Sequence, residues 1–340
     1  MTDTAASERA LIVGAGPIGL ACAVSASRRG LDALVIDAGA IAESIVRYPV
    51  GMTFFTTPER LEIGGHPLVC AGAKATREEA LKYYRGVVRV ERLRVRTGAR
   101  LVGATSGPQG VTCRIATRLG DETVVAERLV LATGYFDHPN RLDVPGESLP
   151  HVSHYFDEAH RSWGQDVVVI GGKNSAIEAA LQLFRAGARV TLVYRGKALP
   201  ASVKYWLKPD FENRVKAGEI SARYDAQVAE ITDREVVLGD GARVRADRVY
   251  ALTGFHPDFD LLRRIGIAFD ENTGRPTLDA NTLETTAPGV YLAGSITAGR
   301  KISEIFIENG RFDGEKIFGD AEARASAEER YAKVNRPTGE

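Results

Sequence analysis

Three glycines near the N-terminus have the spacing that binding of a dinucleotide phosphate requires. Gly14, Gly16 and Gly19 form a Gly-x-Gly-x-x-Gly pattern, with Pro17 inside it. The first glycine makes a tight turn, the second lets the backbone approach a pyrophosphate, and the third lets a helix pack close to a strand. Asp37 ends the next apolar run, where a carboxylate accepts hydrogen bonds from a ribose 2′-hydroxyl and repels a 2′-phosphate. The pattern predicts a site for a dinucleotide with an unphosphorylated ribose.

A second glycine turn departs from this pattern. Gly171 and Gly172 are followed by Lys173, where the third position would otherwise be glycine. Lys173 adds charge near a phosphate or is a solvated loop residue, and the sequence leaves both alternatives open. Asn174 and Ser175 can donate hydrogen bonds to phosphate oxygens.

The end of the following strand has the opposite charge in this second copy. Arg195 stands where the first copy has Asp37, and Lys197 follows two residues later. Removing the acid and adding cations favours a phosphorylated ribose, and therefore NADPH over NADH. The alternative is a solvated basic loop without a ligand.

Each turn lies between an apolar strand and a helix, so the sequence contains the same βαβ plan twice. The pattern predicts strands at 11–13, 33–37, 167–170 and 190–195, and helices at 20–29 and 177–185. Each copy then continues into an alternating segment, at 100–125 and 221–244, which indicates a small antiparallel meander. Each closes on an apolar strand that ends in Thr-Gly, at Thr133-Gly134 and Thr253-Gly254.

One more strand and turn, at 290–295, has no counterpart before the second copy, so we expect the chain to return there to complete the first domain. A helix is expected from about Lys301, and the tail from Ala321 is expected to be a terminal helix or disordered. The predicted fold is α/β, with two Rossmann-like (three-layer ββα) dinucleotide-binding domains and the second inserted in the first. The predicted boundaries are 1–140 with 254–340 for the first domain and 141–253 for the second. The first copy is longer, and its extra insertion is expected within 38–85.

Composition limits the class of function. The chain has 340 residues with 44 basic and 44 acidic side chains, so its charge gives no reason to expect nucleic acid or an anionic membrane as a partner. No apolar stretch approaches the roughly 18 residues that span a bilayer. Cys22, Cys70 and Cys113 are far apart, and without a CxxC pair the sequence predicts neither a metal site nor a local dithiol. A reduced cytoplasmic location is expected.

Six segments of the sequence are specific enough to suggest a family, namely 48–57, 61–65, 76–80, 152–156, 171–176 and 306–311. Together with the two turns and the two Thr-Gly ends, these segments resemble the low-molecular-weight thioredoxin reductase fold over about residues 8 to 320. Within that fold the chain looks most like the bacillithiol-disulfide reductase family of flavoproteins.

The resemblance implies FAD in the first domain and NADPH in the second. Thr53 and Phe54 would lie beside the isoalloxazine, although a phenylalanine there is also explained as core. Ser295 stands where thioredoxin reductases usually have aspartate, so it can hydrogen-bond but carries no charge. The implied FAD residues are Gly14, Gly16, Pro17, Gly19, Asp37, Thr53, Phe54, Thr133, Gly134, Gly294 and Ser295. The implied NADPH residues are Gly171, Gly172, Lys173, Asn174, Ser175, Arg195, Lys197, Thr253 and Gly254.

Two departures from the family concern thiols. Thioredoxin reductases carry CxxC in the stretch that here is 151–157 and has no cysteine, which excludes that activity. Ile18 occupies the position of the cysteine proposed as the redox thiol in many family members. Cys22, one helical turn further on, is a weak candidate that is better explained as packing. His154 and Tyr155 are weak candidates for donating a proton to a leaving thiolate, with packing or a hinge as the alternative.

Three functions are consistent with these residues. The first is an NADPH-dependent flavin reductase of a low-molecular-weight disulfide such as bacillithiol disulfide. The second is a reductase of a small redox protein such as ferredoxin or flavodoxin, and the third is a flavin-binding sensor with little turnover. A flavin monooxygenase is disfavoured, because Gly146 is followed four residues later by Pro150 where that family's signature has histidine. By family resemblance, a homodimer or homotetramer is expected.

Overall fold

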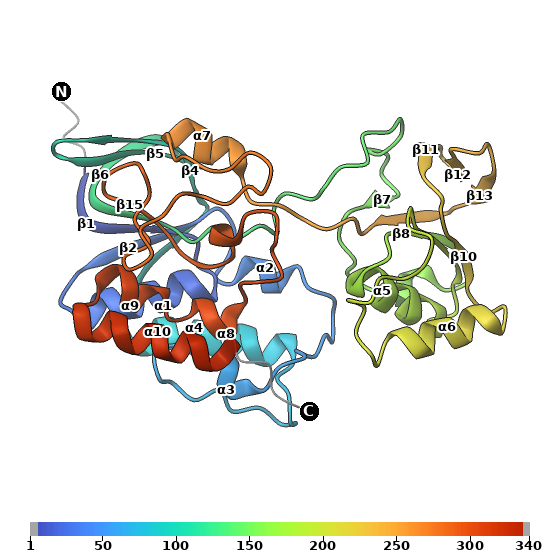
Figure 1. The fold of residues 1–340 in the computed structure, drawn as a ribbon, viewed down its shortest axis with the longest axis horizontal. Coiled ribbons are helices and arrows are strands. Elements are labelled where there is room, and N and C mark those ends of the chain that lie inside the picture. The colour runs from blue at the N-terminus through green and yellow to red at the C-terminus, as the bar shows by residue number, and fades with distance from the viewer. Residues whose placement is uncertain (1–5, 336–340) are drawn as a thin grey trace. The chain divides into compact units, whose positions relative to one another are not determined.

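A computed structural model describes residues 6–335, so the outer limits of the predicted first domain, residues 1 and 340, lie outside the described part. The chain divides into two compact units. The first contains the chain up to Val46, Gly51–His138 and the chain from Phe255 on. The second contains Arg47–Val50 and Pro139–Gly254. Figure 1 shows the elements of each unit.

The first unit is built on one seven-stranded sheet. Its order is β3-β2-β1-β6-β5-β4, and β15 also pairs with β6. The contacts of β1 with β2 and β6, of β2 with β3 and of β6 with β15 are parallel, whereas β4, β5 and β6 pair antiparallel. The strands are β1 (Ala6–Val13), β2 (Ala33–Asp37), β3 (Arg94–Thr97), β4 (Ala99–Gly107), β5 (Gly110–Thr117), β6 (Gly120–Leu131) and β15 (Val290–Leu292).

Helices cover the parallel part of this sheet. Helix α1 is apolar and buried along most of its length because it lies between the sheet and α9, and α4 and α10 lie on the same side (Figure 1). Helix α7 instead contacts β4. The helices are α1 (Pro17–Ser27), α2 (Glu43–Val46), α3 (Pro58–Leu61), α4 (Arg77–Val90), α7 (Phe259–Ile265), α8 (Ile307–Gly310), α9 (Asp313–Phe318) and α10 (Ala321–Asn335), with the 3-10 turn η2 (Gly294–Ala298).

The second unit repeats the plan on a smaller scale. A five-stranded parallel sheet has the order β10-β9-β8-β14-β7, and β11, β12 and β13 form a three-stranded antiparallel sheet. The strands are β7 (Val152–Ser153), β8 (Asp166–Ile170), β9 (Arg189–Val193), β10 (Ser221–Arg223), β11 (Val228–Ile231), β12 (Glu235–Leu238), β13 (Arg243–Arg245) and β14 (Arg248–Ala251). The helices are α5 (Asn174–Arg185) and α6 (Lys208–Lys216), with the 3-10 turn η1 (His160–Ser162).

The predicted α/β fold with two Rossmann-like parts is confirmed, and three local predictions need correction. Ser221–Arg223 was expected to open a meander, but this short strand pairs in parallel with β9 and extends the main sheet. The helix after the strand at 290–292 was expected from about Lys301, but the first α-helix there, α8, begins only at Ile307. Thr133-Gly134 and Thr253-Gly254 follow β6 and β14, whereas α1 and α5 each begin three residues earlier than the pattern indicated.

Candidate functional site

The first glycine turn has the geometry that its spacing predicts. Gly14 has a φ of +109°, and a Cβ there would lie 2.4 Å from the carbonyl oxygen of Ala132. A Cβ on Gly19 would lie 1.9 Å from the carbonyl oxygen of Gly14, so only glycine lets α1 pack this close to the strand end. A Cβ on Gly16 would meet no atom within 4 Å. Gly16 therefore faces open space at the N-terminus of α1, where Pro17 is the first helical residue.

Asp37 connects this turn to the end of β2. One carboxylate oxygen accepts a hydrogen bond from Ala15 N and the other from Gly39 N, each at 2.7 Å. Burial raises the pKa of Asp37 above its usual range, and these two hydrogen bonds oppose that rise. Because each carboxylate oxygen can accept more than one hydrogen bond, Asp37 can hold the turn and still bind a ribose hydroxyl.

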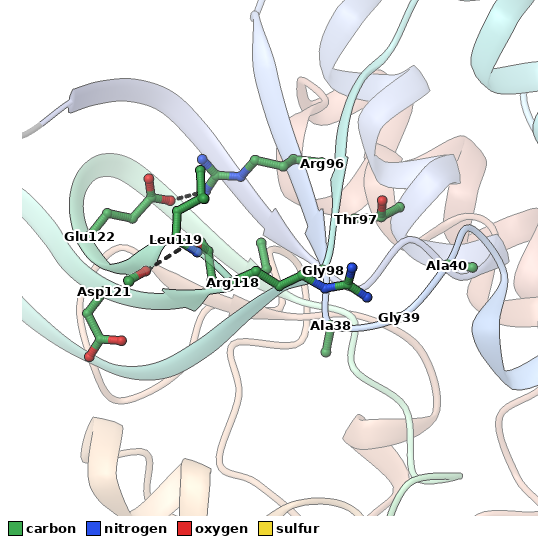
Figure 2. Close-up of a pocket in the computed structure, with 13 residues that line it drawn as sticks. Ala38, Gly39, Ala40, Arg96, Thr97, Gly98, Arg118, Leu119, Asp121 and Glu122 are labelled. Carbon is green, nitrogen blue, oxygen red and sulfur yellow. Dashed lines mark hydrogen bonds and ion pairs between the residues drawn. The ribbon is translucent and has the colours of Figure 1, made fainter.

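A cavity of about 700 Å³ adjoins the segment that follows Asp37 (Figure 2). Ala38, Gly39 and Ala40 form one wall, and the tip of the β5–β6 hairpin forms another. Arg96 pairs with Glu122 at the cavity. This space lies next to the acid expected to bind ribose.

The strand ends of β6 and β15 bring two predicted pairs of residues together. A Cβ on Gly134 would lie 3.7 Å from the hydroxyl oxygen of Ser295, so these residues are neighbours. The Oγ1 atom of Thr133 is buried and has no hydrogen-bond partner among residues 6–335. Gly294 N donates a hydrogen bond of 2.7 Å to Asp313.

Asp313 was not identified from the sequence. It is the first residue of α9, is almost fully buried, and holds the backbone of Gly294 through the hydrogen bond described above. Burial raises the pKa of Asp313 to about 7. The last segment that carries the family resemblance, 306–311, ends two residues before Asp313, and its hydrogen-bond partner Gly294 lies 19 residues away in the sequence. Motif spacing therefore gave no indication that Asp313 has a role.

The segment expected beside the isoalloxazine is fixed to the N-terminus of α4. Thr53 forms an antiparallel bridge with Thr76, and Phe54 N donates to Ala75 O at 2.9 Å. The side chain of Phe54 is buried, whereas Phe55 is half-exposed and lies edge-on to Phe306, with 6.1 Å between ring centroids.

Arg77, also missed from the sequence, anchors this region from the other side. Its guanidinium donates to Ile45 O at 3.1 Å and to Val46 O at 2.6 Å, and its backbone N donates to Met52 O at 2.8 Å. Arg77 therefore connects the end of α2 to the segment that starts at Met52.

The second glycine turn, at Gly171 and Gly172, differs from the first because an aromatic ring packs against it. A Cβ on Gly171, which has a φ of +141°, would lie 2.5 Å from Leu252 O. A Cβ on Gly172 would lie 2.5 Å from the ring of Tyr194, so that ring covers the turn. Lys173 and Ser175 are exposed, whereas the Oδ1 atom of Asn174 accepts a hydrogen bond of 2.9 Å from Lys204 N.

Arg195 and Lys197 follow β9 and are both exposed. In the described part of the chain neither has an ion-pair or hydrogen-bond partner. Thr253 and Gly254 end the unit, and Asn140 pairs with both of them. Thr253 Oγ1 donates to Asn140 O at 2.6 Å, and Asn140 N donates to Gly254 O at 2.9 Å.

The weak catalytic candidates are held by their surroundings. His154 is buried, with Nε2 3.1 Å from Glu147 and Nδ1 3.1 Å from Ala251 O. Burial, followed by the charge of Arg141, lowers the pKa of His154. The hydroxyl of Tyr155 lies 3.5 Å from the guanidinium of Arg47, which also lies over the ring.

The cysteines do not form an accessible thiol pair. Cys22 is fully buried, and burial together with Asp313 and Glu315 raises its pKa well above the usual thiol value. Burial also raises the pKa of Cys113 to about 12. Cys70 lies in a loop, with its sulfur 3.1 Å from Gly72 O.

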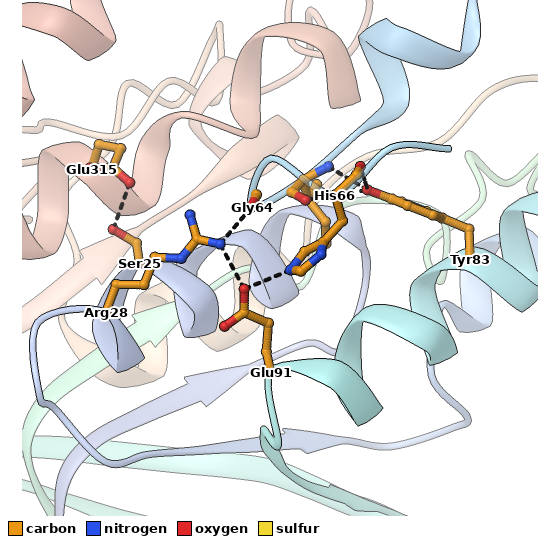
Figure 3. Close-up of polar contacts among 8 residues, drawn as sticks. Ser25, Arg28, Gly64, His66, Tyr83, Glu91 and Glu315 are labelled. Carbon is orange, nitrogen blue, oxygen red and sulfur yellow. Dashed lines mark hydrogen bonds and ion pairs between the residues drawn. The ribbon is translucent and has the colours of Figure 1, made fainter. Parts of the chain in front are cut away.

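A separate polar cluster holds the loop that follows α3 (Figure 3). His66 Nε2 lies 2.6 Å from a carboxylate oxygen of Glu91, and Arg28 donates to the same oxygen at 2.7 Å. Arg28 also donates to Gly64 O at 2.5 Å, and the hydroxyl of Tyr83 donates to His66 O at 2.8 Å. These groups satisfy one another, so the cluster anchors the loop.

Two glycine turns, each at the start of a helix in a Rossmann-like unit, agree with the class of protein that the family comparison identifies. Residues 11–294 match the family model described as pyridine nucleotide-disulphide oxidoreductase, and the chain belongs to this family. Within residues 6–335, no helix is long and apolar enough to cross a membrane, and no cluster of three or more His, Cys, Asp or Glu side chains could hold a metal ion.

Three individual proteins that are similar to this chain are more specific than the family as a whole. The chain is 44% identical to bacilliredoxin reductase Bdr of Bacillus subtilis (strain 168), over 91% of this chain and 96% of that protein. It resembles the solved structure of bacillithiol disulfide reductase Bdr (YpdA) from Bacillus cereus with a TM-score of 0.89 and 42% identity, covering 95% of this chain and 99% of that one. A ferredoxin–NADP reductase of Ignicoccus hospitalis is 29% identical over 86% of this chain and 91% of that protein.

These findings confirm the predicted family resemblance and the predicted class of enzyme. The protein is an FAD- and NADPH-dependent flavin disulfide reductase-like oxidoreductase. The alternative of a flavin-binding sensor with little turnover does not agree with membership of an oxidoreductase family. The residues that contact each cofactor stay predictions.

Proposed function

We propose that the protein takes a hydride from NADPH at the second turn, transfers it to FAD at the first, and reduces a low-molecular-weight disulfide such as bacillithiol disulfide. The overall reaction consumes one NADPH, one proton and one disulfide, and yields NADP⁺ and two thiols. The observation that carries the choice of acceptor is the 44% identity, over nearly the whole chain, to a bacilliredoxin reductase.

The residues at the first turn fit FAD. Gly16 leaves space for a pyrophosphate at the N-terminus of α1, and Asp37 is placed to accept from a ribose hydroxyl. The cavity beside residues 38–40 has room for an adenine ring. The buried hydroxyl of Thr133 needs a partner that the described residues do not supply, and a flavin edge would provide one. The chemistry that FAD supplies when bound is two-electron transfer between a nicotinamide and a disulfide.

The second turn fits a phosphorylated dinucleotide. The exposed guanidinium of Arg195 and ammonium of Lys197 can bind a 2′-phosphate, and the turn at Gly171 presents the N-terminus of α5 to the pyrophosphate. These side chains are exposed, which suits a cofactor that binds and leaves in every turnover.

We propose that disulfide reduction proceeds without a thiol of the protein. Ile18 fills the position of the family's candidate cysteine, and its Cδ1 atom would lie 2.7 Å from a Cβ placed on Gly294 and 2.6 Å from one placed on Gly310. Its side chain is therefore packed against two glycines. Cys22 and Cys113 are buried with raised pKa values, so neither is a ready thiolate.

A second candidate acceptor is a small redox protein. The similarity to ferredoxin–NADP reductases over most of the chain supports it, at the lower identity of 29%. The decisive experiment is an acceptor screen after anaerobic reduction of the protein by NADPH. We expect rapid reoxidation by bacillithiol disulfide and slow reoxidation by ferredoxin or flavodoxin, and the reverse order would overturn the proposed acceptor. The predicted homo-oligomer and cytoplasmic location rest on resemblance and cysteine content, and stay predictions.

A further inference from the structure

The loop at 196–207 lies beside the second glycine turn and has two buried anchors. It begins immediately after Arg195 and leads into α6. Leu199 and Val203 are buried in the core of the second unit, which fixes the middle of the loop. The residues between these anchors and α6 therefore have a defined position.

A side chain of the turn holds the end of this loop. Asn174, the first residue of α5, accepts a hydrogen bond of 2.9 Å from Lys204 N through its Oδ1 atom. The N-terminal N–H groups of a helix are the ones that bind phosphate. The contact thus places the backbone of Lys204 next to the expected phosphate position.

The side chains that follow are large and exposed. The ammonium of Lys204 lies 5.0 Å from the ring centroid of Trp206, and its charge opposes the raised pKa that burial gives Glu178, one turn along α5. The ammonium is therefore within electrostatic reach of the first turns of this helix. Tyr205 is 82% exposed and Trp206 is 48% exposed, and their rings contact edge-on at 4.9 Å between centroids. Exposed aromatic rings beside a cation provide a surface suited to a nucleotide.

We propose that Lys204 binds the pyrophosphate of NADPH and that Asn174 is the positioning residue that holds it there. This inference rests on the proposed placement of NADPH at the second turn. It assigns Lys204 a different role from Arg195. NADPH and NADH share the pyrophosphate, so Lys204 acts on both cofactors, whereas Arg195 acts on the 2′-phosphate that only NADPH carries.

Trp206 provides a direct reporter, because Trp163 is the only other tryptophan in the chain. In a Trp163→Phe background, the fluorescence of Trp206 is titrated with NADP⁺ and with NAD⁺, using the FAD-loaded protein. We expect a saturable change with both nucleotides. The absence of any saturable change would contradict contact of the nucleotide with this loop.

The same titration on variants separates the roles. Lys204→Met should raise the Kd of both nucleotides about tenfold and leave their ratio unchanged, because one charge-assisted hydrogen bond to phosphate is lost. Asn174→Ala should raise both by a few-fold. Flavin content and the limiting rate of flavin reduction should stay at the parent value, which a general structural defect would not allow. Lys208→Met is the matched control, since Lys208 pairs with Glu212 at 3.8 Å on α6, and both Kd values should stay within about twofold.

If Lys204→Met behaves like Lys208→Met, or weakens NADP⁺ alone, the pyrophosphate assignment is wrong. Arg195→Glu distinguishes this failure from failure of the proposed function. If Arg195→Glu weakens NADP⁺ while Lys204→Met does not, only the inference about Lys204 fails. If neither variant changes either Kd, the second turn is not the NADPH site.

Discussion

The two glycine turns have similar backbones but opposite electrostatic environments. At the first, Asp37 is partly buried and already hydrogen-bonded to the turn through Ala15 N. At the second, Arg195 is exposed and unpaired in the described part of the chain, and an aromatic ring, that of Tyr194, covers the turn.

This difference indicates how one fold can hold one dinucleotide and exchange another. A site whose polar groups are fixed before binding loses little conformational entropy when the ligand binds, which favours long retention. Exposed cations attract a phosphorylated ligand but are solvated again when it leaves, which favours exchange. We expect FAD to be retained as a prosthetic group and NADPH to behave as a substrate.

The largest effect is expected from Gly16→Val. The added side chain would enter open space, so the fold should persist while the pyrophosphate is blocked. We expect the FAD content to fall from one per chain to below about a tenth, because the phosphate contacts depend on backbone approach. Absorbance at the flavin band and circular dichroism measure both properties. Gly86→Val, at another glycine with open space, should keep its flavin, and a fully yellow Gly16→Val protein would show that this turn does not bind FAD.

Arg195→Glu should invert the preference between NADPH and NADH. A charge-assisted contact to phosphate is worth roughly 1.5–3 kcal/mol, so NADPH binding should weaken by about 10- to 150-fold. Stopped-flow reduction of the flavin at several concentrations of each cofactor gives the affinities. Arg161→Glu, another exposed arginine of the same unit, should leave the preference unchanged. An unchanged preference in Arg195→Glu would assign the 2′-phosphate to other residues.

Much of this organisation follows from local sequence. A glycine pattern determines a turn through residues that are close together in the sequence. The turns at Gly14 and Gly171 and both Thr-Gly strand ends were therefore predictable. Asp313 and Arg77 were not, since their roles depend on contacts with Gly294 and Val46 that only tertiary packing creates.

The sequence also does not determine which side chains of a predicted segment point into the core and which point towards solvent, because tertiary packing decides this. Phe54 and Phe55 are adjacent and identical in type, yet one is buried and the other half-exposed. The sequence identified Asn174 as a possible phosphate donor but could not reveal that its carbonyl oxygen holds Lys204.

Asp313→Asn should change the dependence of stability on pH. The folded pKa of about 7 lies above the value near 3.9 of an unfolded aspartate. Below about pH 4 the Asp313 carboxyl is protonated in both the folded and the unfolded state. Between about pH 4 and pH 7 it is ionised only in the unfolded state, so its destabilising effect grows as the pH rises and is complete above about pH 7. Asparagine keeps an acceptor for Gly294 N without the charge.

We therefore expect Asp313→Asn to raise the Tm relative to the wild type, and this rise should be several degrees larger at pH 8 than at pH 5. Differential scanning fluorimetry at both values measures this. Asp320→Asn, at an exposed aspartate, should show no such pH-dependent gain. An equal shift of Asp313→Asn at both pH values would mean that Asp313 is ionised throughout.

The smallest effect is expected from the cysteines. Replacing Cys22, Cys70 and Cys113 by alanine should leave the anaerobic rate of flavin reduction by NADPH within a few-fold of wild type, because Cys22 and Cys113 are buried with raised pKa values and hydride transfer from NADPH to FAD needs no thiol. Turnover with bacillithiol disulfide should also persist. If Cys22→Ser alone abolished that turnover while flavin reduction stayed intact, Cys22 would be the redox thiol.

Retention of one cofactor and exchange of the other can be measured in a single preparation. The purified protein is reduced anaerobically with one equivalent of NADPH, reoxidised with the disulfide, passed through a desalting column, and analysed for both nucleotides. We predict complete bleaching of the flavin, followed by recovery of one FAD per chain with almost no NADP⁺. Loss of FAD on the column, co-elution of stoichiometric NADP⁺, or a flavin that NADPH does not bleach would contradict the assignment of the two turns.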